Sequence, residues 1–126
     1  DEKYGQELLF VFVDELCKSL SVKDDVPVAY FLKLWDVADG EFGEYMWEMF
    51  HYVLLNKPDV VLKHVDEFAK YKDTIRFVAN EDIDPKEQEA LVKQYRQRIN
   101  DQGAKRVLSW ISREGYVPVA ERPENR

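Results

Sequence analysis

The 126-residue sequence is acidic, with 25 acidic and 18 basic residues and a formal net charge of −7. Its 45% apolar and 34% charged residues are typical of a globular protein, because disordered chains combine low hydrophobicity with a high net charge. A chain of this size usually forms one domain and can bury about two thirds of its unfolded surface. The acidic balance disfavours nucleic acid and anionic lipid as partners, since binding to either depends on Lys and Arg.

The sequence also restricts the kinds of site that the chain can form. Cys17 is the only cysteine, which excludes an intrachain disulfide and a multi-cysteine metal site. The longest apolar run covers residues 8–13 and is far shorter than the roughly 20 residues that span a bilayer. We therefore expect a soluble protein. The chain begins at Asp1 rather than Met, as an exported protein does after processing, so the compartment stays open between cytoplasmic and exported.

The first predicted helix covers residues 4–21, where apolar side chains recur at helical spacing opposite Asp14, Glu15 and Lys18. Its predicted buried stripe consists of Leu9, Phe12, Val13, Leu16, Cys17 and Leu20. The run over 8–13 could also form a short strand, but no second strand-like run lies nearby to pair with it. The context favours a helix.

The second and third helices are predicted from their caps. Asp24 and Asp25 precede Pro27, and proline suits the first turn of a helix because it has no N–H to leave unsatisfied. Gly40 predicts the end of the second helix, and Asp39 can cap a third helix that runs to residue 55. The predicted buried stripes are Tyr30, Phe31, Leu34, Trp35 and Ala38 in the second helix, and Phe42, Tyr45, Met46, Met49, Phe50 and Val53 in the third.

The later helices are predicted from the same signals. Pro58 opens a fourth helix, whose apolar face continues to residue 69, and Asp73 starts a short fifth helix through residue 78. Asp84, Pro85 and Glu87 form the clearest start signal, a capping box, at the beginning of the sixth helix. We expect that helix to end near residue 103 and helical spacing to resume over 104–114.

Together these signals predict an all-α fold. The expected architecture is an irregular bundle or short superhelix of about six to seven helices. Residues 1–114 are expected to form a single helical domain with an acidic body and a mildly basic end, since residues 1–84 carry −10 and residues 85–126 carry +3. Residues 115–126 hold two prolines and mixed charges without helical spacing, and are expected to form an extended or flexible tail.

Two histidines raise the alternative of a small enzyme or a metal-binding helical protein. Glu48 and His51 are three residues apart, as in the di-iron sites of helical bundles. Such a site also needs a second Glu-x-x-His pair, and the residue three positions before His64 is Val61. The stretch 36–41 superficially resembles a calcium loop but lacks the ligand spacing of one. The sequence therefore predicts no metal and no cofactor, and leaves Glu48, His51 and His64 as the residues of the alternative.

Other catalytic and nucleic-acid patterns are also weak. The five glycines form no phosphate loop. The candidate nucleophiles lie outside the sequence context of a nucleophile elbow: Cys17, Ser19, Ser21, Ser109 and Ser112. We name no catalytic residue. The basic side chains of the last helices are interrupted by Glu87 and Glu89, which favours a solvated surface over a nucleic-acid site.

The density of aromatic residues is the most informative feature. Eight of the 17 aromatic residues fall between Tyr30 and Tyr52, and the third helix cannot direct all of its rings to one side. That helix is therefore expected to have neighbours on two sides. The first interpretation is a central helix of the core. The second is a protein-binding patch, because exposed Tyr and Trp anchor interfaces.

The sequence thus favours a non-enzymatic helical protein-interaction domain, of a binding, inhibitory or immunity type. Its partner is expected to be a protein, possibly a basic one, and the oligomeric state stays open. The candidate binding residues combine aromatic side chains with an acidic rim: Trp47, Tyr52, Asp36, Glu41, Glu44 and Glu48.

Overall fold

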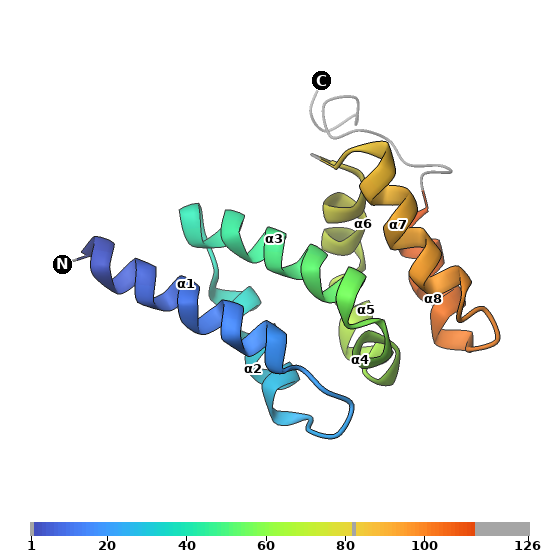
Figure 1. Cartoon of the computed structure of the whole chain (residues 1–126), viewed down its shortest axis with the longest axis horizontal. Coiled ribbons are helices and arrows are strands. Elements are labelled where there is room, and N and C mark those ends of the chain that lie inside the picture. Colours follow the sequence, from blue (N-terminus) through green and yellow to red (C-terminus); the bar gives the residue numbers. More distant parts are fainter. Residues whose placement is uncertain (1, 82, 113–126) are drawn as a thin grey trace. The chain divides into compact units, whose positions relative to one another are not determined.

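A computed structural model describes residues 2–81 and 83–112 (Figure 1). These residues form eight helices and no β-strand, which confirms the all-α fold class. None of these helices is both long enough and apolar enough to cross a membrane. The chain divides into two compact units, Asp1–His64 (unit 1) and Val65–Arg126 (unit 2). The single domain expected over 1–114 stays a prediction, and the tail expected over 115–126 lies outside the described residues.

Unit 1 contains α1 (Glu2–Ser19), α2 (Val26–Val37), α3 (Gly40–Asn56) and α4 (Pro58–Lys63). Helices α1 and α3 lie side by side (Figure 1). Helix α2, which connects them in the sequence, also packs against α1. The fully buried side chains of this unit come from all four helices and include Val13, Phe31, Met46, Phe50 and Val61.

Two aromatic clusters join α3 to its neighbours. On the α2 side, the Phe50 ring lies 5.3 Å from the Phe31 ring and 5.1 Å from the Trp35 ring. On the α1 side, the Phe10 ring stacks on the Tyr45 ring at 4.4 Å and on the more distant Phe42 ring. The expectation that the third helix is contacted on two sides is confirmed.

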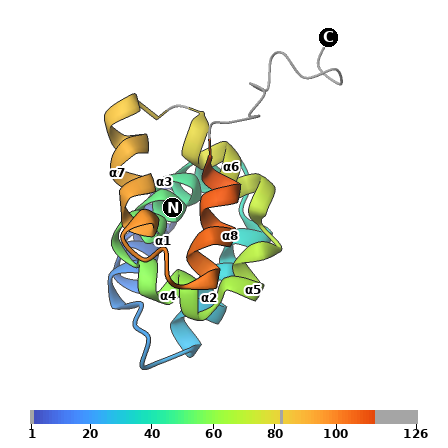
Figure 2. The same ribbon diagram turned by 90° about the vertical axis from the view of Figure 1, so that its right-hand side faces the viewer.

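Unit 2 contains α5 (Val65–Ala69), α6 (Lys72–Asn80), α7 (Pro85–Arg96) and α8 (Gln102–Ile111). Helix α8 lies between α6 and α7 (Figure 2). The last carbonyl groups of a helix have no partner within the helix. Here the Arg76 guanidinium of α6 donates to the Ser109 and Trp110 carbonyls at 2.8 and 3.1 Å, and the Gln88 amide of α7 donates to the Ile111 carbonyl at 2.9 Å. Side chains from both neighbours therefore fix the end of α8.

The predicted start of α7 is confirmed, whereas its predicted end is wrong. The Asp84 carboxylate accepts a hydrogen bond from the Glu87 backbone N–H at 2.9 Å. The helix then ends at Arg96 instead of near residue 103, in a turn over 97–100. Asp101 caps α8 by accepting from the Gly103 N–H at 2.7 Å. Gly103 therefore lies in the first turn of a helix rather than at the end of one.

Three other expectations about the helices need correction. The fourth helix expected over 58–69 is two helices, α4 and α5, because the backbone of His64 between them leaves the helical conformation, with φ −111° and ψ 32°. Gly40 has the left-handed φ of +55° that its sequence position suggested, yet it is the first residue of α3, and α2 ends at Val37. Tyr30 was expected in the buried stripe of α2 but is 57% exposed.

The central position of Phe50 leads to a first prediction. Phe50→Ala should lower the free energy of unfolding by about 3 to 5 kcal/mol, because it leaves a cavity between α2 and α3. Chemical denaturation measures this loss. Phe12→Ala is the matched control, since the Phe12 ring is 54% exposed, and should cost less than about 1 kcal/mol. Equal losses in the two variants would contradict this account of the core.

The cap of α7 leads to a second prediction. Asp84→Ala should cost about 1 kcal/mol, because the Glu87 N–H loses its hydrogen-bond partner. Asp39→Ala is the matched control: Asp39 holds the N-cap position of α3, but its side chain makes no capping hydrogen bond. Thermal melts of the two variants give the comparison. A shift in midpoint for Asp39→Ala as large as that for Asp84→Ala would show that the capping bond does not contribute.

Candidate functional site

The aromatic residues of α2 and α3 separate into buried and outward-facing rings. The ring contacts of unit 1 involve Phe31, Trp35, Phe42, Tyr45 and Phe50. Trp47 is 39% exposed, and Tyr52 is partly exposed. The expected core role of the aromatic cluster therefore holds for most of its members, whereas Tyr30 of α2 and Trp47 of α3 are exposed.

Five of the six predicted binding residues share that side of α3. Glu41, Glu44 and Glu48 are exposed and follow one another at spacings of three and four residues, which places them on one face of the helix. Trp47 and Tyr52 are separated by roughly 140° around the helix axis, so they lie at opposite edges of the acidic row. We call these five residues the α3 face. Asp36 is also exposed but belongs to α2 and is not part of this face.

The α3 face continues onto α1 at the edge marked by Tyr45. The Tyr45 hydroxyl donates a hydrogen bond to the Phe10 carbonyl of α1 at 2.9 Å. Burial raises the pKa of this hydroxyl above its ordinary value, and the negative charges of Asp14 on α1 and Glu48 on α3 raise it further. The hydrogen bond from Tyr45 therefore joins this edge of α3 to α1.

Lys18 lies on the same edge of α1. Its ammonium group is 2.8 Å from the Asp14 carboxylate. This hydrogen bond and ion pair raise the pKa of Lys18, with smaller contributions from Glu15 and Tyr52. The basic side chain that borders the α3 face is therefore already paired within α1.

The outward side of α1 exposes apolar side chains that the sequence analysis did not identify. Leu8, Val11 and Phe12 are 52%, 60% and 54% exposed, although Phe12 was expected in the buried stripe. Residues 8–13 are apolar on all sides of the helix, so spacing alone could not show that Phe12 lies on the exposed side. In the structure the opposite side, with Val13 and Cys17, is buried. The run of six apolar residues was itself the signal of a second apolar face.

The residues of the enzyme or metal alternative lie in different surroundings. Glu48 is exposed on α3, His51 follows one turn later and is partly buried, and His64 lies after α4. Among residues 2–81 and 83–112, no group of three or more His, Cys, Asp and Glu side chains is arranged to hold a metal ion.

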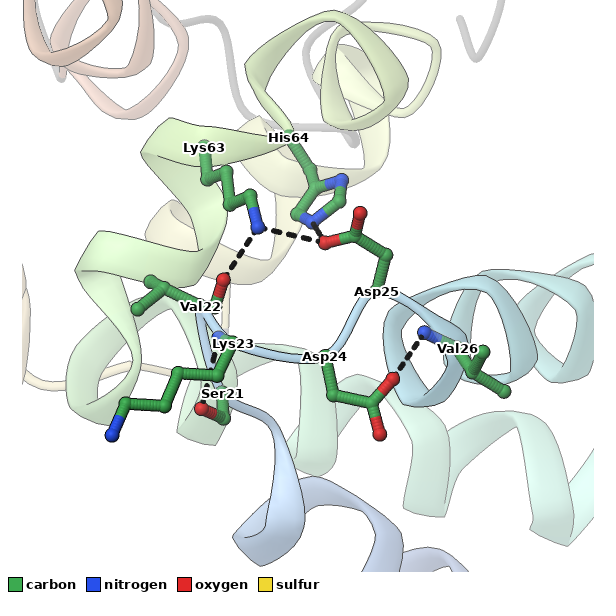
Figure 3. A network of polar contacts seen from close by, with 8 residues as sticks. All are labelled: Ser21, Val22, Lys23, Asp24, Asp25, Val26, Lys63 and His64. Carbon is green, nitrogen blue, oxygen red and sulfur yellow. Dashed lines mark hydrogen bonds and ion pairs between the residues drawn. The ribbon is translucent and has the colours of Figure 1, made fainter.

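His64 contacts the loop between α1 and α2 (Figure 3). Its Nε2 atom lies 3.2 Å from the Asp25 carboxylate, which the Lys63 ammonium group also approaches at 2.9 Å. The hydrogen bond from Lys63 is the main cause that lowers the pKa of Asp25. Lys63 also donates to the Val22 carbonyl of the same loop. These contacts attach the loop to α4, which is a structural role for His64.

Three of the five candidate nucleophiles, Cys17, Ser19 and Ser109, are buried or hydrogen-bonded within their own helices. Cys17 is buried, and burial beside Asp14 raises the pKa of its thiol to about 12, so the reactive thiolate is suppressed at neutral pH. The hydroxyls of Ser19 and Ser109 donate to the carbonyls of Leu16 and Arg106 in their own helices.

The net charge of the chain belongs to unit 1. Residues 1–64 hold 13 acidic and 6 basic residues, which gives −7, whereas residues 65–126 hold 12 of each sign, which gives zero. The α3 face therefore lies in the unit that carries the whole excess of negative charge.

Comparisons with protein-family models, with characterised proteins and with solved structures found no match for the chain.

Proposed function

We propose that this chain is a non-enzymatic helical domain that acts by binding another protein, and that the α3 face is its contact surface. The observation that carries the proposal is the exposure of Trp47 beside an acidic row, on a helix whose Tyr45 and Phe50 rings pack against α1 and α2. Tryptophan is enriched among the residues that dominate binding energy, and it is costly to leave in water.

The charge of unit 1 indicates the chemistry of the partner. Glu41, Glu44 and Glu48 are three of the 13 acidic residues that give unit 1 its net charge of −7. A basic protein surface complements this field, and complementary charge speeds association. The proposed partner is therefore a basic protein.

The rigid support of the α3 face also favours binding. Phe50 and Tyr45 hold α3 against α2 and α1 from its inner side, so the helix needs no rearrangement to present Trp47. A surface that is already ordered loses less conformational entropy when a partner binds.

Trp47→Ala tests this proposal. Proteins captured by the wild-type chain from its native source are identified, and their affinities are then measured with purified components. Trp47→Ala should weaken binding by about 2 kcal/mol or more, which is roughly 30-fold in Kd, while the helical content is unchanged. Tyr30→Ala removes an exposed ring from α2 instead and should leave the affinity within about twofold. Unchanged binding in Trp47→Ala, or loss of folding in that variant, would rule out Trp47 as an exposed anchor.

Charge reversal at Glu41 and Glu44 tests the steering of the partner. The double variant Glu41→Lys, Glu44→Lys should slow association by about tenfold at low salt and reduce its salt dependence, while dissociation changes little. The control Glu67→Lys, Glu89→Lys makes the same change in net charge on exposed residues of unit 2. Stopped-flow association rates at several salt concentrations separate the two variants. If both slow association equally, net charge rather than the α3 face attracts the partner.

A further inference from the structure

The exposed apolar side chains of α1 form a ridge beside the α3 face. Leu8, Val11 and Phe12 are spaced by three and four residues, which places them on one side of the helix, and each is more than half exposed. A helix that is apolar on all sides is normally covered on all sides. The core of unit 1 covers the side with Val13 and Cys17, and the ridge remains accessible.

Acidic groups border this ridge. Glu7 and Glu15 are exposed on α1, one turn before Val11 and one turn after it. Between residues 5 and 19 Lys18 is the only basic residue, and it is paired with Asp14. Glu48 is exposed on α3, the helix that packs beside α1. The surface therefore combines an apolar ridge with acidic side chains one turn before and one turn after it.

We propose that the ridge of Leu8, Val11 and Phe12 binds a basic amphipathic helix of the partner protein, whose Lys and Arg side chains meet the acidic border. This inference rests on the proposed function and specifies the partner's binding element. Side chains three and four residues apart form the ridges that pack into the grooves of another helix, and an amphipathic helix presents its anchors at the same spacing.

Other occupants fit the ridge less well. Anionic lipid would be repelled by the acidic border. A second copy of the chain in a two-fold arrangement would bring the same acidic border against itself, and like charges across an interface are unfavourable. An extended segment would need the edge of a sheet, and residues 2–81 and 83–112 form no strand.

A peptide titration tests the inference. The probe is a fluorescein-labelled synthetic peptide of Leu and Lys, as long as α1, with its leucines on one side of a helix. The first control peptide has the same composition in an order that disperses the leucines, and the second replaces every Lys by Glu. Fluorescence anisotropy of each peptide with the intact chain at physiological salt should show binding of the Leu and Lys helix at least about tenfold tighter than of either control.

Variants of the chain locate the binding site. Phe12→Ser should weaken binding of the Leu and Lys helix by at least about tenfold, because it breaks the ridge. Tyr30→Ser removes a similarly exposed ring from α2 and should change the affinity by less than about twofold. Thermal melts should show both variants folded, since both rings are more than half exposed. Equal effects of the two variants, equal binding of the dispersed peptide, or unfolding of Phe12→Ser would overturn the inference.

Two further measurements separate this inference from the proposed function. If capture of the natural partner depends on Trp47 but not on Phe12, the proposed function stands and the ridge is not the docking site. If neither residue matters, both proposals fail. Sedimentation of the wild-type chain and of Phe12→Ser tests whether a second copy of the chain covers the ridge instead. Self-association that is lost in Phe12→Ser would assign the ridge to a second copy and overturn the inference.

Discussion

The arrangement of unit 1 depends on the contact of the Phe50 ring with Phe31 and Trp35. This contact joins α2 to α3, and the Phe10 and Tyr45 rings join α1 to the neighbouring side of α3. Because α3 uses two flanks for these contacts, only one face is left for Glu41, Glu44 and Glu48. The same packing that builds the core therefore determines which side chains of α3 a partner can reach.

Helix starts could be predicted from the sequence because their signals are local. Asp84 and Pro85 mark the beginning of α7, and the bond from the Glu87 N–H to Asp84 needs no distant residue. Helix ends were harder to predict. Gly103 resembles a stop signal, but it is buried in the first turn of α8, and its N–H donates to Asp101, the N-cap of that helix. The break at His64 was also missed, because the loop that Lys63 and His64 hold through Asp25 lies far away in sequence.

The α3 face could be predicted in part for the same reason. The spacing of Glu41, Glu44 and Glu48 places them together on any regular helix, so tertiary structure was not needed to group them. The orientation of Phe12 and Tyr30 did need it. Both residues fit an apolar stripe by spacing, and only the packing of α1 and α2 against α3 determines that the rings remain outside. Spacing therefore identifies which residues share a face, and packing determines whether that face is buried.

The two kinds of side chain on the outer surface of unit 1 would serve binding in different ways. Charge acts over about 8 Å at physiological salt, so the excess of −7 in unit 1 can orient a basic protein before contact. Apolar side chains act only when water leaves the surface, so Trp47 and the ridge of Leu8, Val11 and Phe12 would determine how long the complex lasts. A surface that carries both features side by side can select a partner by its charge and retain it by its apolar residues. An acidic surface without exposed apolar side chains would attract basic proteins without holding any one of them. On the proposed function, the exposed apolar side chains of α1 and α3 would therefore be the part of this surface that favours a specific partner over a general affinity for basic proteins.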